Sequence, residues 1–585
     1  MAWPTTTWAP SRRPLTRMPL DIPTENLPVL VAFGCYLIGV VSLGLISHRF
    51  LKKGDFVKEY FIGNRGLGPW VLAFTVAGTA ISGGTFVGFP ALIYSKGWIM
   101  ALWIASYMVV PLTALILMGK RLNQVSRMTG AVTVSDILRD RFRSPALGIF
   151  STLLILGFLS VNLIAQFKAA GLVMKEALQL PPGMIELPIL GQSIDRGYFY
   201  GLIIFAFTVV AYTTYGGFWA VAWTDVLEGS VKLLGGMPMA VLALGAVPAI
   251  GGKTGLAAAT EHLRQQDPNL VLGPGPDNFL PLGMAFSFFL MWSITTPGQP
   301  HSMVRLMSFK DARSLSRSLL LVCVYYVITY GSLVVIFICA RAIFPVEYLP
   351  GKGTLGQPDS IMPAMALKVA PPLVAGLLLA APFAAIMSSV AAFLLMISSS
   401  LVRDIYQRTI NPEVTPRVLK AASYLATALV GVCVLIGALH PPDFLQYIIV
   451  FTSTGLACAF LIPMLMLLYW RRATGPGVMA AMLGGLVTVM LLYVAGWTDT
   501  LSQDAIRRYQ VGGDGAAPVV AQWLQDHLQW LSGWGAKRPT ALAPLHVGGV
   551  DTLVWGFLVS LTLGLGVSLT TRTDEKLTER YFPSE

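Results

Sequence analysis

Charged residues are scarce in this 585-residue sequence. Asp, Glu, Lys and Arg make up 12% of it, whereas 55% of the residues are hydrophobic; an average soluble protein is about 25% charged. This composition excludes an ordinary soluble domain and indicates a protein that lies in a lipid bilayer. The formal net charge is +12, but the basic residues form no nucleic-acid-binding pattern. Contact with anionic lipid and membrane topology account for that charge.

Cysteine and histidine are also few. The five cysteines fall in or at the ends of apolar stretches, without the spacing of a disulfide framework or a metal site, and we expect them to be small core residues. The six histidines are scattered and show no ligand spacing. Residues 245–254 resemble a phosphate-binding loop, but Val247 stands where that motif requires glycine. We therefore expect no cofactor, no catalytic residue and no enzyme activity.

Long apolar stretches, in contrast, are abundant. Thirteen of them approach or exceed the ~20 residues that cross a bilayer. The sequence therefore predicts an all-α polytopic membrane protein with about 13 transmembrane helices. The predicted spans are 28–47, 70–95, 97–118, 146–174, 198–216, 226–250, 279–303, 318–340, 372–402, 418–438, 443–470, 476–497 and 548–570.

Lysine and arginine are unevenly distributed among the loops that join these spans. They are more numerous after the odd-numbered spans, and such segments stay on the cytoplasmic side. We therefore expect the N-terminus outside and the C-terminus inside a bacterial cytoplasmic (inner) membrane. Residues 1–27 would form an N-terminal tail, with Met18 as an alternative true start, and residues 571–585 a cytoplasmic tail. Residues 28–570 would form a single domain.

Span 2 contains more glycine and hydroxyl residues than a plain spanning helix needs. A helix that is broken at mid-membrane frees backbone carbonyls, which can hold an ion or a solute together with nearby hydroxyls. Small residues also permit close packing of continuous helices, so both interpretations remain open for this segment alone. The residues concerned are Thr75, Gly78, Thr79, Ser82, Gly83, Gly84, Thr85, Gly88 and Pro90.

Span 7 is interrupted in a similar way. Two prolines and a glycine accompany Ser293, Thr295, Thr296 and Gln299 in an otherwise apolar run. Proline removes a backbone donor and clashes with the preceding turn, which favours a break. Spans 2 and 7 are five spans apart and run in opposite directions. Two interrupted helices in corresponding positions indicate the binding site of an inverted-repeat transporter.

Span 9 carries the adjacent hydroxyls of Ser388 and Ser389. Serine in a spanning helix frequently bonds the carbonyl four residues before it. Hydroxyls and free carbonyls are also ligands that a hard monovalent cation prefers. The pair therefore has either a structural role or a role in holding a cation.

Few charges lie within the spans, and each is a candidate for function. Asp225 begins span 6, where it suits the helix dipole or the inner exit route of an ion. Glu228 and Lys232 are four residues apart, and we expect them to neutralise each other. Lys168 has no acid near it in the sequence. It either snorkels to the interface or faces the cavity as the partner of an anionic solute.

At these residues the chain resembles the sodium/solute symporter family, whose fold is the LeuT-type five-plus-five inverted repeat. The pattern is most similar to the pantothenate and monocarboxylate branches. The resemblance implies a leading helix at 28–47, a first repeat at 70–250, an inverted second repeat at 279–470 and two extra helices in 476–570. The motifs are YFIGNRGLGPW (60–70), AISGGTFVGFPAL (80–92), YTTYGGFWAVAWTDV (212–226), GQPHSMVRLMSFKD (298–311) and AAIMSSVAAFLLMISSSLVRDIYQR (384–408).

The extra helices flank an external loop at 498–547. Apolar residues between Val520 and Trp534 keep helical spacing, which predicts a short amphipathic helix at the membrane surface. A loop of this length also suits a lid over the outer vestibule.

The resemblance also implies a sodium site, with sodium as the only metal. Its ligands would be the carbonyls of Gly78, Ile81 and Ala385 and the hydroxyls of Ser388 and Ser389. Asp225 matches the family's acid on the cytoplasmic side. The expected substrate-binding residues are Thr79, Ser82, Gly83, Thr85, Lys168, Trp292, Thr295, Thr296 and Gln299.

Four residues depart from the family pattern. Some members carry an aspartate where Ala80 stands, and glutamine is usual where Glu228 stands. Lys168 and Lys232 add positive charge near the core. These departures leave open a different coupling ion or an anionic solute.

The function that the resemblance implies is secondary active transport, with sodium-coupled symport of a small organic solute by alternating access. A carboxylate is our guess for the solute. The alternatives are a membrane-embedded sensor or receptor with the same fold, and a proton-coupled transporter. The expected partners are the solute, sodium and the lipid bilayer, with no nucleic acid and no obligate protein partner.

Overall fold

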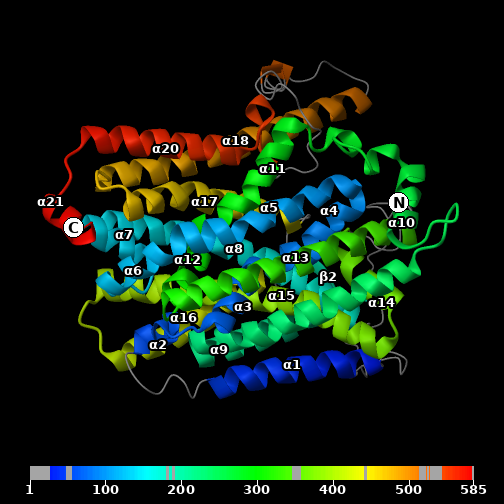
Figure 1. The fold of residues 1–585 in the computed structure, drawn as a ribbon, viewed down its shortest axis with the longest axis horizontal. Coiled ribbons are helices and arrows are strands. Elements are labelled where there is room, and N and C mark those ends of the chain that lie inside the picture. The colour runs from blue at the N-terminus through cyan, green and yellow to red at the C-terminus, as the bar shows by residue number, and fades with distance from the viewer. Residues whose placement is uncertain are drawn as a thin grey trace, which may run out of the picture.

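A computed structural model describes residues 27–47, 56–178, 183–187, 192–344, 358–439, 445–512, 522–523, 526–527 and 543–582. These residues form a bundle of helices with one small antiparallel hairpin (Figure 1). In the hairpin, β1 (Met184–Leu187) pairs with β2 (Gln192–Asp195), and Met184 lies opposite Asp195. The predicted tail at 1–27 lies outside the described residues except for Leu27, and so does Met18.

Nine long helices make up most of the bundle. They are α1 (Leu27–Ser47), α8 (Pro145–Leu178), α9 (Arg196–Ala246), α13 (Ala312–Ile343), α15 (Pro372–Ser399), α16 (Pro416–Gly437), α17 (Leu445–Tyr469), α18 (Gly475–Gly512) and α20 (Thr552–Thr570) among the described residues.

Shorter helices complete the spans and connections. The α-helices are α2 (Phe56–Ile62), α3 (Pro69–Ala80), α4 (Phe89–Lys96), α5 (Leu102–Pro111), α6 (Lys120–Thr129), α7 (Val134–Phe142), α10 (Gly255–Gln266), α11 (Leu282–Thr295), α12 (Pro300–Met307), α14 (Ile361–Val369) and α21 (Glu575–Tyr581). The π-helical turns are η4 (Gly84–Gly88), η6 (Leu112–Gly119) and η12 (Ser400–Ile410). Short 3₁₀ turns are η3 (Gly63–Arg65), η5 (Gly97–Ala101), η7 (Pro268–Leu270), η8 (Pro276–Asn278), η9 (Thr296–Gly298), η11 (Pro358–Ser360) and η13 (Val547–Gly549).

Ten helices in the described residues are long and apolar enough to cross a membrane. The expected count of 13 is therefore not confirmed. The two counts differ where helices merge or break. The stretch Gly84–Thr129 runs through two predicted spans, and Arg196–Ala246 covers two more, with a kink at Gly217. Span 7 is divided into pieces too short to be counted.

The predicted break in span 2 is confirmed. Helix α3 ends where Ile81 adopts an extended conformation, with φ −93° and ψ 100°. The chain resumes as the π-helical turn η4 and continues into α4. Gly83 has a helical φ of −56°, so this glycine is needed for space rather than for an unusual dihedral.

Span 7 is broken as predicted. Helix α11 passes into η9, and Gln299 is then extended, with φ −83° and ψ 122°, before α12 begins at Pro300. Pro297 and Pro300 cannot donate a backbone hydrogen bond, which is the physical reason that the α-helix cannot continue.

Helix α15 forms the centre of the bundle. Nearly all of its side chains are buried, and it packs against α1, α3, α8, α9 and α16. Helix α1 lies at one outer edge, while α18 and α20 pack together at the opposite edge (Figure 1). The centre of the bundle is therefore the place where polar side chains are shielded from lipid.

Two predictions for peripheral parts of the chain need correction. Cys35 and Cys433 are exposed rather than core residues, so they face outward from the bundle. Helix α18 continues to Gly512, beyond the predicted span end at residue 497. Most of the predicted surface helix around 520–534 lies outside the described residues, although Trp523 and His527 are helical there, with stacked rings.

Candidate functional site

The two broken spans meet at one cavity in the centre of the bundle. Residues next to the break in span 2 and residues on both sides of the break in span 7 form much of its wall. Its volume is about 50 Å³, enough for a few water molecules. The lining residues are Thr79, Ala80, Ser82, Gly84, Thr85, Phe89, Tyr107, Asn162, Trp292, Thr295, Thr296, Gln299, His301, Ser302, Phe393, Gln446, Ile449 and Ser453.

Seven of the nine predicted substrate residues line this cavity: Thr79, Ser82, Thr85, Trp292, Thr295, Thr296 and Gln299. Gly83 does not. Its backbone N–H donates to Gln166 Oε1 at 2.8 Å, and a Cβ at this position would lie 2.7 Å from that oxygen. Gly83 therefore provides close packing against α8, and the neighbouring Gly84 faces the cavity instead.

Lys168 also lies away from the cavity lining. Its Nζ is 3.6 Å from Asp359 Oδ2, and the two side chains are only 4% and 5% exposed. The lysine therefore has a buried acid as its partner, 191 positions later in the chain. The expectation of a lysine facing the cavity for an anionic solute is corrected, and so is the expectation that it snorkels to the interface.

Several lining residues were not predicted from the sequence. Asn162 Nδ2 donates a hydrogen bond to Thr452 Oγ1 at 2.7 Å. Its Oδ1 accepts a hydrogen bond from Gln166 Nε2 at 3.1 Å. Gln446 is buried, yet neither atom of its side-chain amide has a hydrogen-bond partner. A single amide in the apolar run 443–470 was the signal that could have identified Gln446.

Two further lining residues present unpartnered polar atoms. Trp292 Nε1 and His301 Nδ1 are buried without a hydrogen-bond partner. Buried polar groups are costly when they are unsatisfied, so these atoms, together with the Gln446 amide, are the natural contacts for a polar solute. Among the described residues, the cavity lining contains no lysine, arginine, aspartate or glutamate.

A second cavity lies next to the first. Its volume is about 110 Å³, and its walls are mostly apolar, with Phe279, Met284 and Phe288 among them. Phe89, Trp292 and Gln446 line both cavities and separate them. Ala543, Pro544 and His546, in the last part of the predicted 498–547 loop, also border it. The end of that loop therefore borders a cavity that adjoins the central one.

The predicted sodium ligands are brought together at the break in span 2. Ser388 Oγ lies 2.9 Å from the Gly78 carbonyl and 3.1 Å from the Ala385 carbonyl. Ser389 Oγ lies 3.4 Å from the Thr79 carbonyl and 3.3 Å from that of Ala385. Ile81, the remaining predicted ligand, is buried at the end of α3. We refer to these oxygens as the cation site.

Lys232 lies directly at the cation site. Its Nζ donates to Ser388 Oγ at 2.7 Å and to the Gly78 carbonyl at 3.3 Å. Both carboxylate oxygens of Glu228 are buried without a hydrogen-bond partner. Lys232 and Glu228 interact electrostatically, but the ammonium donates its hydrogen bonds to oxygens of α3 and α15.

Asp225 lies beside the same site. It is fully buried, and its Oδ2 accepts a hydrogen bond from Thr75 Oγ1. Arg305, buried on α12, contributes a favourable charge interaction with this carboxylate. A buried carboxylate next to Gly78 places negative charge close to the cation site, which favours any cation there.

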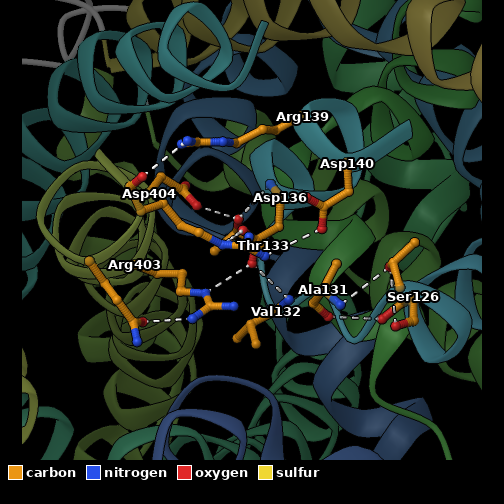
Figure 2. A network of polar contacts seen from close by, with 12 residues as sticks. Ser126, Ala131, Val132, Thr133, Asp136, Arg139, Asp140, Arg403 and Asp404 are labelled. Atoms are coloured by element: carbon orange, nitrogen blue, oxygen red, sulfur yellow. Dashed lines mark hydrogen bonds and ion pairs between the residues drawn. The ribbon is translucent and has the colours of Figure 1, made fainter. Parts of the chain in front are cut away.

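A separate polar cluster joins α7 to η12 (Figure 2). Asp136 forms ion pairs with Arg403 Nε at 3.1 Å and with Arg408 Nε at 3.0 Å. Thr133 Oγ1 donates to Asp404 Oδ1 at 2.6 Å. These contacts connect residues about 270 positions apart, so they hold the end of the α15 segment against the connection that follows α6.

Asp140 extends this cluster. Its Oδ2 lies 3.3 Å from Arg408 Nη2. Burial raises the pKa of Asp140 above its ordinary value even though Arg408 opposes that shift. Desolvation therefore outweighs the ion pair at this position, and the cluster is more than a set of solvated surface charges.

The sequence and the fold are similar to those of known transport proteins. A profile of the "Sodium:solute symporter family" matches residues 60–485. The sodium/pantothenate symporters of Haemophilus influenzae and Escherichia coli are each 32% identical to this chain; the alignments cover 80% of it and 90% and 91% of those proteins. A sodium/proline symporter of Staphylococcus aureus is 26% identical to this chain, and the alignment covers 90% of this chain and 97% of that protein.

The fold has a solved counterpart. The structure of a Na⁺-coupled sialic acid symporter, in a substrate-bound outward-open state, aligns with a TM-score of 0.66 and 18% sequence identity. The alignment covers 94% of this chain and 99% of that one. The expected LeuT-type architecture is therefore confirmed.

Proposed function

Because the chain belongs to the sodium:solute symporter family and is therefore an integral membrane protein for sodium-coupled symport, we propose that its solute is a small carboxylate, bound in the central cavity. Pantothenate, proline and sialic acid, which the names of the similar proteins give, all carry a carboxylate group. We further propose that the protein lies in a bacterial cytoplasmic membrane, with its N-terminus outside and its C-terminus inside, since the basic residues favour that orientation.

The observation that carries the proposal is the position of Thr79. It lines the central cavity, and its carbonyl lies 3.4 Å from Ser389 Oγ in the cation site. One residue at the broken end of α3 thus contacts both sites. A solute and a cation that bind together would fix the same broken helix, which is a direct physical basis for coupling their transport.

Neutral donors would hold the carboxylate, since none of the described residues that line the cavity is a lysine or arginine. The unpartnered Trp292 Nε1 and the Gln446 amide can donate to it, and hydrogen bonds to a charged acceptor are stronger than those between neutral groups. A sodium ion at the adjacent cation site would offset the negative charge of the solute. Asp225 would then receive the ion on its inner route.

Flux measurement in proteoliposomes tests the proposal. Pantothenate, proline and sialic acid would be offered with an inward sodium gradient, and then with potassium replacing sodium. We expect sodium-dependent accumulation of a carboxylate and no accumulation of its primary amide, the matched neutral control. Equal uptake of acid and amide would contradict the carboxylate assignment, and uptake indifferent to sodium would contradict the coupling.

Replacing Gln446 by leucine should weaken solute binding. The change keeps the approximate size of the side chain but removes both amide atoms that face the cavity. Loss of one or two hydrogen bonds to a charged solute predicts a rise in the solute KM of about 10- to 100-fold. Ile449→Leu, at another lining position, is the control and should keep KM within about threefold. A wild-type KM in Gln446→Leu would remove this amide from the binding site.

Replacing Ser389 by alanine should weaken sodium dependence. The hydroxyl is one of several proposed ligands, and its loss should cost on the order of 1–3 kcal/mol of cation binding, roughly a 5- to 150-fold rise in half-saturating sodium. Ser399→Ala, on the same helix but outside the cation site, is the matched control. If Ser389→Ala leaves the sodium dependence of uptake unchanged, the proposed ligand set is misplaced.

A further inference from the structure

Lys232 places a positive charge where a sodium ion is expected. Its ammonium is fully buried and within hydrogen-bond distance of two proposed ligand atoms, Ser388 Oγ and the Gly78 carbonyl. Both oxygens can equally serve a small monovalent cation. The ammonium and a sodium ion would also repel each other strongly at such short range in a buried site. The same oxygens therefore serve one cation or the other.

We propose that Lys232 is a tethered cation that fills the cation site when sodium is absent, and that sodium binds only by displacing it. The proposal rests on the proposed function in one respect, namely that sodium uses the oxygens at Gly78, Ala385, Ser388 and Ser389. It adds a residue that sets how strongly the site holds sodium, through competition rather than through coordination.

The displaced ammonium has a second place to go. Glu228 lies one helical turn before Lys232, and both of its buried carboxylate oxygens lack a hydrogen-bond partner. Glutamate and lysine four residues apart in this order pair readily on a helix. Lys232 thus has two positions within reach: the cation site, which it occupies in this structure, and the Glu228 carboxylate, which it would occupy when sodium is bound.

The surrounding charge fits this exchange. Asp225 and Glu228 are both buried near Lys232 and interact with it electrostatically. If the ammonium were removed, these acids would lose a compensating charge. Sodium entering the vacated site would then supply it, so loss of Lys232 should strengthen sodium binding rather than weaken it.

Equilibrium binding of ²²Na⁺ to the purified full-length protein tests the proposal without relying on transport. Lys232→Met removes the charge and keeps most of the side-chain length, and we expect sodium affinity to rise about 10-fold or more. Lys232→Arg keeps a competing cation, so its sodium affinity should remain as low as that of the wild type. Glu228→Gln removes the alternative partner of the ammonium and should lower sodium affinity below that of the wild type.

A matched control is Lys175→Met. Lys175 pairs with Asp195 at the end of α8, and it is partly exposed and away from the cation site; its variant should bind sodium as the wild type does. Lys232→Gln provides a second uncharged variant if Lys232→Met does not fold, with the same expected gain. Unchanged or weaker sodium binding in the folded uncharged variant would overturn the proposal.

Failure of the inference is distinguishable from failure of the proposed function. If Ser389→Ala weakens sodium binding while Lys232→Met leaves it unchanged, the site is correct and only the competition is wrong. If Ser389→Ala has no effect, the sodium site lies elsewhere, and the competition at these oxygens is overturned with it. A gain in Lys232→Met together with a loss in Ser389→Ala supports both.

Discussion

Replacing Gly83 by leucine should abolish solute uptake. A Cβ at this position would lie 2.7 Å from Gln166 Oε1, 3.0 Å from Ala169 Cβ and 3.1 Å from Ile386 Cγ1. Contacts this short force the backbone at the break away from α8 and α15, and even the first added carbon has no space. The hydrogen bond from the Gly83 N–H to Gln166 would be lost in the same movement.

The expected result is a protein that inserts in the membrane, with uptake below about 1% of the wild-type rate, since misplacement of a site by about 1 Å already costs about 100-fold. Gly157→Leu is the matched control, because Gly157 lies on α8 and a Cβ added there would meet no heavy atom within 4 Å. Membrane insertion is checked by the yield of purified protein and uptake by flux in proteoliposomes. Normal uptake by Gly83→Leu would indicate that α3, η4 and α4 form a tolerant, loosely packed junction.

Replacing Lys168 by methionine should destabilise the protein strongly without altering the solute KM. The change leaves the buried Asp359 carboxylate without its ion-pair partner, and breaking a buried pair from one side typically costs about 3–5 kcal/mol. Asp359→Leu should be similarly harmful, because it removes the buried ion-pair partner of the lysine. The double variant Lys168→Met/Asp359→Leu should regain most of the loss, since apolar groups can replace a buried ion pair.

Thermal unfolding of the detergent-solubilised variants measures this coupling. The single variants should unfold at clearly lower temperature than the wild type, with the double variant between. The solute KM of the folded fraction should stay unchanged in all three, because Lys168 does not line the cavity. A large rise in KM with normal stability in Lys168→Met would restore the lysine as a direct solute contact.

Local sequence was sufficient to predict both helix breaks. Pro297 and Pro300 cannot continue the backbone hydrogen-bond pattern in span 7. The glycines next to Ser82 lower the stability of a continuous helix in span 2. The number of separate spans was harder to predict, since Gly217 bends α9 without ending it. Hydropathy reports where the chain is apolar, but it does not report where one helix passes into the next.

Contacts between distant residues could not be predicted. Nothing near Lys168 in the sequence points to Asp359, and Lys232 bonds Ser388 across 156 positions. The four-residue spacing predicts the charge interaction of Glu228 with Lys232, but it does not reveal the two oxygen acceptors on other helices that the Lys232 ammonium contacts. Sequence spacing predicts contacts within one helix, whereas the partner of a buried charge often lies on another helix and depends on how the helices pack.

The choice of glycine at the break was also beyond the sequence. Gly83 and Gly84 are adjacent, and only the second faces the cavity. Gly83 packs against Gln166 of α8 instead. Which of two adjacent glycines meets a neighbouring helix depends on contacts between distant segments, and the local sequence does not report them. The family resemblance, not periodicity, selected the cation-site residues.

The oxygens beside Ser388 and Ser389 have a consequence for divergence among related genes. Those of Gly78, Thr79 and Ala385 belong to the peptide backbone, so no codon change deletes them. Substitutions can change such a site only through the two serine hydroxyls and the residues that surround it. A lineage that exchanged Lys232 for a neutral residue would change the sodium concentration at which its transporter works, while every backbone oxygen stayed in place.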